Sequence, residues 1–140
     1  MLSVDEVLKK AKRIAIVGLS DKPERPSYQV AKYLKEKGFE IIPVNPTIES
    51  VLGIKSFSKF SDIPFSLKVD VVDIFRRAEQ VLPIVEEIVG SGQKPIIWFQ
   101  EGSENPKAEK LARENGFEII SGVCLMMAHQ KQANKSQFSD

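Results

Sequence analysis

The sequence predicts a doubly wound α/β domain, in which helices cover both faces of a parallel β-sheet. Short apolar runs of strand length alternate with segments of helical periodicity along the chain. These runs are nearly continuous in apolar residues, which is typical of strands buried on both faces. Turn-forming glycine, proline and asparagine residues stand between many of the segments.

The expected helices are indicated by signals at their ends. Ser3 and Glu6 have the spacing of a capping box, which predicts a short helix to about residue 12. Pro26 suits the first turn of a second helix, which is expected to end at Gly38. Further helices are expected at 78–89, at 105–115 and around 124–129.

The five main strands are expected at 13–17, 39–44, 69–75, 95–99 and 117–120, with a turn and a short strand at 52–57. Right-handed crossovers between them predict a Rossmann-like sheet, most simply with strand order 3-2-1-4-5. The 140 residues suffice for one domain with its own core. We expect this domain to span residues 1–131 and the polar segment 132–140 to be a frayed tail.

The composition argues against several classes of protein. A net charge of +1 gives no reason to expect bulk binding to nucleic acid or to an anionic membrane. No apolar run approaches the roughly 18–20 residues of a membrane span. Residues 1–13 mix acids and bases without an apolar core, so we expect no signal peptide and a cytoplasmic location. The single Cys124 and single His129 exclude a disulfide framework and predict no metal site.

The strand at 13–17 runs through Gly18 and Ser20 into a polar loop and then a helix, as at the phosphate-binding corner of a nucleotide-binding domain. Gly18 permits close approach of a ligand, Ser20 offers a hydroxyl, and the helix directs its positive end at the loop. Lys22 and Arg25 add positive charge. The second and third glycines of the dinucleotide fingerprint are absent, and a plain turn with solvated charges is the alternative interpretation.

The end of the second strand argues against NAD. Dinucleotide-binding domains carry an acidic residue there for the ribose hydroxyls, whereas this chain has Asn45 followed by Pro46. A neutral amide can hydrogen-bond a base or a ribose but lacks the charged acceptor. The alternative is that Asn45-Pro46 only initiates a turn.

Two other strand ends carry candidate ligand contacts. Phe75 can pack against a nucleobase and Arg76 can bind a phosphate with two parallel hydrogen bonds; the alternative is a core phenylalanine and a solvated arginine. Gln100 is a candidate polar wall opposite Ser20, and Gly102 can admit the backbone close to a ligand.

Three further residues are weighed and set aside as catalytic groups. Asp73, near the end of a central strand, is costly to bury unpaired, so we expect a loop amide or basic partner and a structural role. Cys124 and His129 lie five residues apart, about 140° around a helix axis, and do not face each other. A buried structural cysteine is therefore the favoured interpretation, and no catalytic residue is predicted.

Taken together, these segments resemble the small stand-alone coenzyme A-binding proteins, which are similar to the N-terminal domain of the succinyl-CoA synthetase alpha subunit. The matching motifs follow one another between about residues 11 and 131, at 16–20, 22–28, 42–46, 69–76 and 98–102, and at Cys124 with His129. One departure is Val123, which stands where family members often carry a basic residue. The catalytic phosphohistidine of the synthetase lies outside this domain, and His129 does not replace it.

The resemblance implies a bound CoA. Its phosphates would lie on Gly18, Leu19 and Ser20 and on the helix start, with Lys22 and Arg25 nearby, and its 3′-phosphate would need a cation in place of the ribose acid. The adenosine end would reach toward Asn45-Pro46 and Phe75-Arg76. The implied site residues are Gly18, Leu19, Ser20, Lys22, Arg25, Ser27, Tyr28, Asn45, Pro46, Phe75, Arg76, Gln100 and Gly102.

The leading hypothesis is a cytosolic module that binds CoA or an acyl-CoA without intrinsic catalysis, because no nucleophile–base, paired-carboxylate or metal constellation stands out. Two enzyme hypotheses remain: an NAD(P)-dependent redox protein, and a thiol-exchange protein in which Cys124 meets the thiol of CoA. A subunit that works with a partner chain, or a homo-oligomer, is a third hypothesis.

Overall fold

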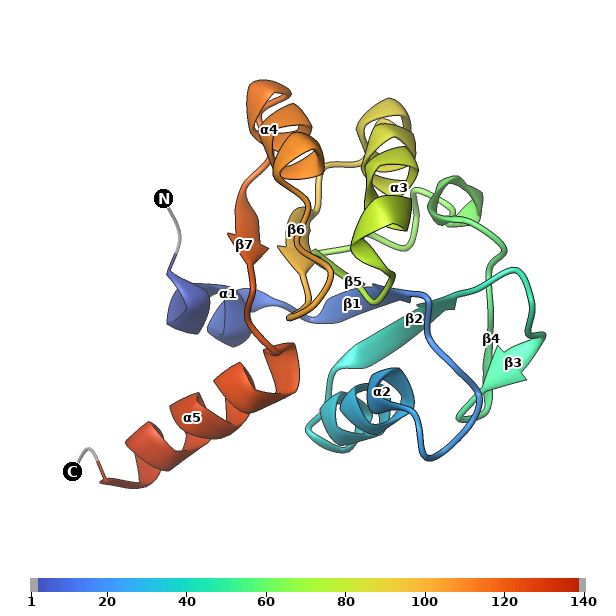
Figure 1. Ribbon diagram of the computed structural model, residues 1–140. Coiled ribbons are helices and arrows are strands. Elements are labelled where there is room, and N and C mark those ends of the chain that lie inside the picture. Colours follow the sequence, from blue (N-terminus) through green and yellow to red (C-terminus); the bar gives the residue numbers. More distant parts are fainter. Residues whose placement is uncertain (1–2, 139–140) are drawn as a thin grey trace.

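The computed structural model describes residues 3–138 and has three layers (Figure 1). A parallel sheet lies in the middle. One face is covered by α3 (Ala78–Gly90) and α4 (Pro106–Glu114), and the other by α1 (Val4–Lys10), α2 (Pro26–Glu36) and α5 (Leu125–Phe138). The predicted fold class is therefore confirmed.

The sheet contains β1 (Arg13–Val17), β2 (Glu40–Val44), β5 (Val71–Ile74), β6 (Ile96–Phe99) and β7 (Ile119–Ser121). Its order is β2-β1-β5-β6-β7, with every neighbouring pair parallel. A small antiparallel hairpin of β3 (Ser50–Val51) and β4 (Ile54–Lys55), then the 3₁₀ turn η1 (Phe60–Asp62), connect β2 to β5.

The predicted strand order, 3-2-1-4-5, is wrong. Counted over the five main strands, the observed order is 2-1-3-4-5, with the second strand at the edge and the third inside the sheet. Two features of the sequence account for this. Pro43 in β2 has no N–H to donate to a further strand on the outer side of β2, whereas every residue of β5 is buried and suits a central position.

The observed order decides where a ligand can bind. The chain passes from β1 outward to β2 and then returns to the other side of β1 to form β5. The winding therefore reverses between β1 and β5, and ligands of doubly wound sheets bind beyond the carboxyl ends of the strands at such a reversal. Gly18 and Phe75, which follow these two strands, thus become neighbours.

The two faces of the sheet hold separate apolar clusters. Ala15, Val17, Val72 and Ile74 pack with α3 and α4, whereas Ile16 and its neighbours pack with α1, α2 and α5. The second cluster includes the fully buried Trp98, whose Nε1 donates to the carbonyl oxygen of Val123 at 2.8 Å. This bond satisfies the indole N–H and attaches the segment before α5 to the sheet.

The predicted helix ends are largely confirmed. Ser3 and Glu6 form the capping box, and the Asn105 side chain caps α4 by accepting from Ala108 N. The last helix is longer than predicted, because α5 continues to Phe138, through most of the segment expected to be a frayed tail. That segment contains no glycine or proline, and Gln132 Nε2 donates to the carbonyl oxygen of Asp5 at 3.1 Å. Residues 139–140 lie outside the described residues.

The expected partner of Asp73 is not found. Its side chain is fully buried, and within residues 3–138 neither carboxylate oxygen has a hydrogen-bond partner. Asp73 stands in register with Ile16 of β1 and Trp98 of β6, both of which are apolar neighbours. Desolvation raises the pKa of this carboxyl well above its usual value, which favours the neutral acid.

Candidate functional site

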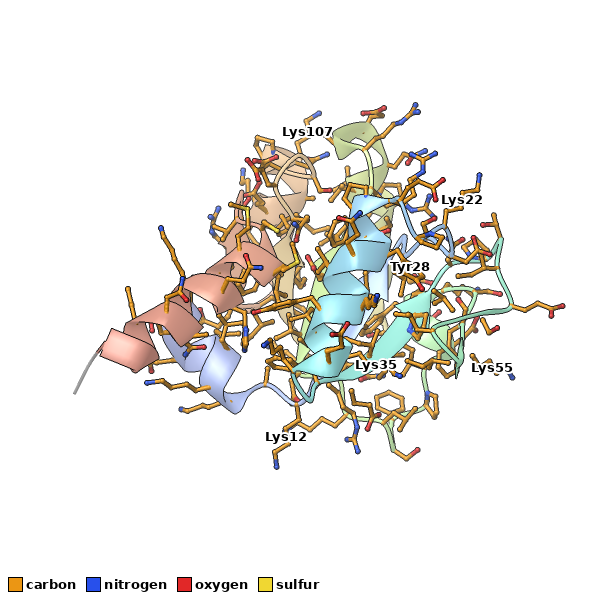
Figure 2. The ribbon with its side chains drawn as sticks, turned by 90° about the horizontal axis from the view of Figure 1, so that it is seen from below. Lys12, Lys22, Tyr28, Lys35, Lys55 and Lys107 are labelled. Atoms are coloured by element: carbon orange, nitrogen blue, oxygen red, sulfur yellow. The ribbon has the colours of Figure 1, made fainter. Side chains whose placement is uncertain are left out.

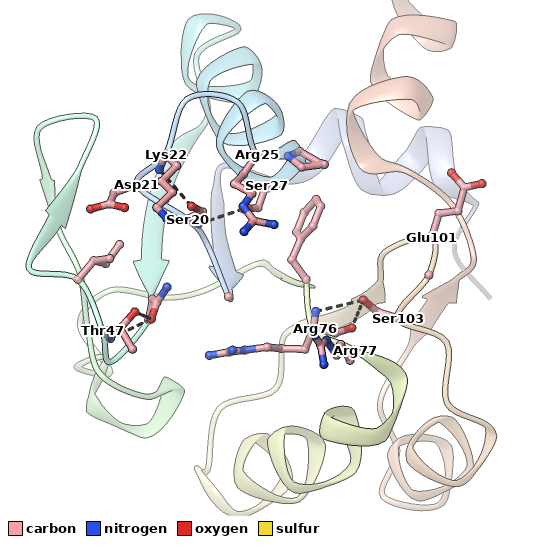
Figure 3. Close-up of a pocket in the computed structure, with 16 residues that line it drawn as sticks. Ser20, Asp21, Lys22, Arg25, Ser27, Thr47, Arg76, Arg77, Glu101 and Ser103 are labelled. Atoms are coloured by element: carbon pink, nitrogen blue, oxygen red, sulfur yellow. Dashed lines mark hydrogen bonds between the residues drawn. The ribbon is translucent and has the colours of Figure 1, made fainter.

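A cavity of about 540 Å³ opens at the carboxyl ends of the strands (Figure 3). The loops after β1, β2, β5 and β6 all contribute to its walls. Its lining residues are Gly18, Ser20, Asp21, Lys22, Arg25, Pro26, Ser27, Asn45, Thr47, Ile48, Phe75, Arg76, Arg77, Glu101, Gly102 and Ser103. The cavity therefore lies where the observed strand order places a ligand site.

Gly18 forms the floor where β1 and β5 end. Its N–H donates to the Val44 carbonyl oxygen, and the Phe75 N–H donates to the Val17 carbonyl oxygen, both at 2.8 Å. Gly18 has φ +89°, and a methyl group added to it would collide with the Phe75 carbonyl oxygen. Only glycine fits both the backbone conformation and the close approach of β5.

The loop from Ser20 to α2 is shaped by its own hydroxyl groups. The Ser20 N–H donates to Ser27 Oγ at 3.0 Å, and the Lys22 N–H donates to Ser20 Oγ at 3.1 Å. Arg25 occupies the N-cap position of α2, but its side chain makes no capping hydrogen bond. The N-terminus of α2 therefore faces the cavity without a side-chain cap, and its dipole favours an anion there.

Four cationic side chains surround the cavity. Lys22 and Arg25 come from the loop after β1, and Arg76 and Arg77 come from the turn after β5 on the facing side (Figure 3). Within the described part of the chain none of the four forms an ion pair. Because only two carboxylates join them in the lining, the cavity is cationic although the whole chain is nearly neutral.

Figure 2 shows where three labelled lysines lie relative to α2. Lys22 lies beyond the N-terminal end of this helix, next to the cavity, whereas Lys35 lies near its C-terminal end and Lys12 lies at the same end of the molecule as Lys35. Lysines thus occur at both ends of the molecule. Of these three, only Lys22 lines the cavity.

The turn that carries Arg76 is braced from the next loop. Ser103 is buried, its Oγ donates to the Arg76 carbonyl oxygen at 2.6 Å, and it accepts from the Arg76 N–H at 3.2 Å. One hydroxyl thereby satisfies both backbone groups of Arg76 and holds the β5–α3 turn against the β6–α4 loop. The sequence interpretation did not select Ser103 as a site residue; its position after a strand end was the available signal.

Asn45 is a structural link as well as a lining residue. Its Nδ2 donates to the Leu19 carbonyl oxygen at 2.9 Å, and its Oδ1 accepts from the N–H and the hydroxyl of Thr47. The side chain thus turns the chain after β2 and ties that turn to the glycine loop. The turn interpretation is confirmed, and the residue still borders the cavity.

Nine of the thirteen predicted site residues line the cavity: Gly18, Ser20, Lys22, Arg25, Ser27, Asn45, Phe75, Arg76 and Gly102. The other four lie elsewhere. Leu19 is fully buried, Tyr28 packs against the cluster between the sheet and α2, and Pro46 is exposed outside the lining. Gln100 is buried and accepts from the Leu125 N–H at 3.3 Å, so it supports α5 rather than forming a wall opposite Ser20.

The lining also contains residues that the sequence interpretation did not select. Besides Ser103 these are Asp21, Pro26, Thr47, Ile48, Arg77 and Glu101. All of them lie within two residues of a selected residue in the same loops.

Cys124 and His129 do not form a pair. His129 Nδ1 shares a hydrogen bond of 2.7 Å with the Tyr33 hydroxyl, and the rings of Tyr33 and Phe39 meet the imidazole edge-on. Burial, with a smaller contribution from Lys37, lowers the pKa of His129. His129 is therefore a packing residue between α5 and α2.

Residues 3–138 lack the features of two other classes of site. No group of three or more metal-ligating side chains is found there. No helix in that range is long and apolar enough to cross a membrane.

The sequence matches the CoA binding domain family over residues 12–130. This chain belongs to that family. The resemblance inferred from the ordered motifs is thereby confirmed. The uncharacterized protein YneT of Bacillus subtilis is 41% identical over 126 residues, which cover 90% of this chain and 91% of YneT.

Other relatives place the same domain in larger proteins. The alpha subunit of an ADP-forming acetate–CoA ligase from Pyrococcus furiosus is 30% identical over 122 residues, which cover 80% of this chain but only 26% of the subunit. A solved structure of a hypothetical protein from Pyrococcus horikoshii matches with a TM-score of 0.86 and 38% identity, over 94% of this chain and 93% of that one. Segments similar to this chain thus make up nearly the whole of some relatives and about a quarter of a ligase subunit.

Proposed function

We propose that this protein is a cytoplasmic binding module for CoA or an acyl-CoA, with the nucleotide in the cavity at the carboxyl ends of β1 and β5. The observation that carries the proposal is the meeting of Gly18, the N-terminus of α2 and four unpaired cations around one cavity of about 540 Å³. Membership of the CoA binding domain family supports the choice of ligand.

The phosphate groups are assigned to the two cationic walls. The pyrophosphate is placed over Gly18 and Ser20, where the N-terminus of α2 supplies backbone donors and a favourable dipole. The 3′-phosphate of the ribose requires a cation, and Arg76, held by Ser103, presents a guanidinium suited to bind phosphate through two parallel hydrogen bonds.

The same geometry disfavours NAD. Asn45 occupies the position of the ribose-binding acid, and both ends of its side chain amide are already engaged by Leu19 and Thr47. It supplies no charged acceptor for the ribose hydroxyls. We therefore favour a ligand whose ribose carries a phosphate, and we assign no catalysis to the cavity.

Calorimetric titration and thermal unfolding with CoA, dephospho-CoA and NAD test this proposal. A hundredfold excess of CoA over its dissociation constant should stabilise the fold by about 2.7 kcal/mol, which corresponds to a rise in Tm of roughly 10 °C for a domain of this size. Dephospho-CoA, which lacks the 3′-phosphate, should bind more weakly. A shift with NAD and none with CoA would overturn the proposal.

Paired variants locate the nucleotide. Arg76→Ala should weaken CoA binding about tenfold or more, because a hydrogen bond to a charged group contributes roughly 1.5–3 kcal/mol. Arg113→Ala is the matched control, since Arg113 is exposed in the last turn of α4 and is absent from the lining. Equal affinity for CoA in the two variants would contradict the placement of the phosphate at Arg76.

A further inference from the structure

A second groove lies beside the nucleotide cavity, between the start of α1 and α5. It has a volume of about 600 Å³, and its floor is the segment from Gly122 to Cys124 that joins β7 to α5. Val123, Met127 and Ala128 supply much of its apolar lining. Polar and charged residues, among them Asp5, Lys131 and Lys135, make up the other half of the lining, but apolar atoms supply most of its surface, unlike in the first cavity.

The two hollows share one lining residue. Glu101, in the loop after β6, lines both of them, and the adjoining Gly102 belongs to the first. Gly102 has φ +95°, and a Cβ there would meet no atom within 4 Å, so there is open space beside the backbone at this residue. A ligand that leaves the first hollow past Glu101 therefore meets the second along the edge formed by the strand ends.

The separation suits the flexible arm of CoA. The groove floor follows β7, which is three strands from β1, where the pyrophosphate is placed, or about 14 Å at the usual spacing of neighbouring strands. The pantetheine arm between the pyrophosphate and the sulfur spans roughly 15 Å when extended, from ordinary bond lengths. A nucleotide bound at Gly18 and Arg76 can therefore bring its sulfur to the groove.

One side chain marks the groove as a surface for an apolar group. Met127 is 58% exposed, and among residues 3–135, whose side chains the structure describes, only Phe65, at 69%, is a large apolar side chain of comparable exposure. Phe65 lines neither hollow, whereas Met127 borders the apolar groove. Methionine is an adaptable contact for flexible hydrocarbon chains.

We propose that this groove receives the acyl chain of a CoA thioester whose nucleotide occupies the first cavity. The inference rests on the proposed function and narrows it from CoA in general to thioesters with an apolar acyl group of several carbons. The uncharged pantetheine arm of CoA passes from the first cavity to the groove at Glu101, whose carboxylate can accept an N–H from an amide of the arm. The acyl chain then lies against Val123 and Met127. Free CoA leaves the apolar lining uncovered.

Isothermal titration of the full chain with CoA, acetyl-CoA, butyryl-CoA and hexanoyl-CoA tests the inference. A fully buried methylene raises affinity about fourfold, and we expect about twofold per methylene in this half-open groove. Hexanoyl-CoA should therefore bind roughly 15-fold more tightly than acetyl-CoA. Met127→Glu should remove this gradient and leave the affinity for free CoA nearly unchanged.

Phe65→Glu is the matched control, because it places the same charge at the other exposed apolar residue, outside both hollows. It should keep the full gradient. Equal binding of CoA and all thioesters, or a gradient that survives Met127→Glu, overturns the inference and leaves the proposed function intact. Failure of CoA and every thioester to bind overturns both. A dimer in analytical ultracentrifugation that Met127→Glu dissociates assigns the groove to a second copy and also overturns the inference.

Discussion

Replacing Gly18 with alanine tests the close approach of β1 and β5 on which the candidate site depends. Gly18 has φ +89°, and its missing side chain would point at the carbonyl group of Phe75 and lie 3.3 Å from Arg76 Cδ. The Phe75 carbonyl is a backbone atom within a hydrogen-bonded sheet end, so it cannot rotate away as a flexible side chain can. The strand ends must separate to admit the methyl group.

The expected cost has two parts. A left-handed backbone conformation costs an alanine about 1–2 kcal/mol. Separating the strands also weakens the bond from the Phe75 N–H to the Val17 carbonyl oxygen, and an unsatisfied buried group costs about 1–3 kcal/mol. We therefore expect Gly18→Ala to lose about 2–5 kcal/mol, which is a large part of the 5–15 kcal/mol typical of a domain.

Gly38→Ala separates the conformational cost from the cost of moving the strand ends apart. Gly38 has a similar φ of +97°, but a Cβ there would meet nothing within 4 Å, so this variant should lose only the conformational cost. Urea unfolding followed by circular dichroism measures both free energies of unfolding. If Gly18→Ala is no less stable than Gly38→Ala, the close contact with Phe75 does not limit this position and the reasoning is refuted.

Three further predictions concern polar side chains. Burial raises the pKa of the Asp73 carboxyl, so in the folded state this carboxyl stays protonated at pH values above its unfolded pKa of about 3.9. The free energy of unfolding of the wild type should therefore fall as the pH rises from the unfolded pKa to the folded pKa. Asp73→Asn should flatten this fall in urea unfolding between pH 5 and 8, and parallel profiles for the two proteins would contradict the assignment. Ser103→Ala should lose about 1–3 kcal/mol and weaken CoA binding, because both backbone groups of Arg76 lose their partner; unchanged stability would show that the brace is dispensable. Asn105→Ala should lose about 0.5–2 kcal/mol through its cap on α4, measured by the same unfolding assay, and a loss near zero would argue against the cap.

Local signals in the sequence were sufficient for the elements of this fold. The apolar runs mark all five main strands, and the capping box at Ser3 and Glu6 marks the first helix, since hydrogen bonds and burial within a few residues determine such features. The last helix was predicted too short because polar residues without a breaker are equally compatible with a tail. Its contact with Asp5, more than a hundred residues away, is a tertiary one.

The sequence contains a signal for the observed strand order that the prediction did not use. Pro43 cannot donate a hydrogen bond and therefore indicates an edge strand, a signal that the assumed 3-2-1-4-5 order ignored. The assumed order would place Phe75 two strands from Gly18, although the motif resemblance still put both residues in one site. Crossover connections of this length are compatible with several orders, so the pairing depends on which strands bury best together.

The sequence by itself determined that this protein is a doubly wound α/β domain with a glycine corner, an asparagine where NAD-binding domains have an acid, and cations in two separate loops. Only the tertiary structure decided that these loops face one cavity, that Ser103 rather than Gln100 supports it, and that Asp73 is buried without a partner. The physical reason is the separation along the chain over which each effect acts. Propensities and caps act between neighbours in the chain, whereas cavities and unsatisfied buried groups arise from residues that only the packing of the sheet brings together.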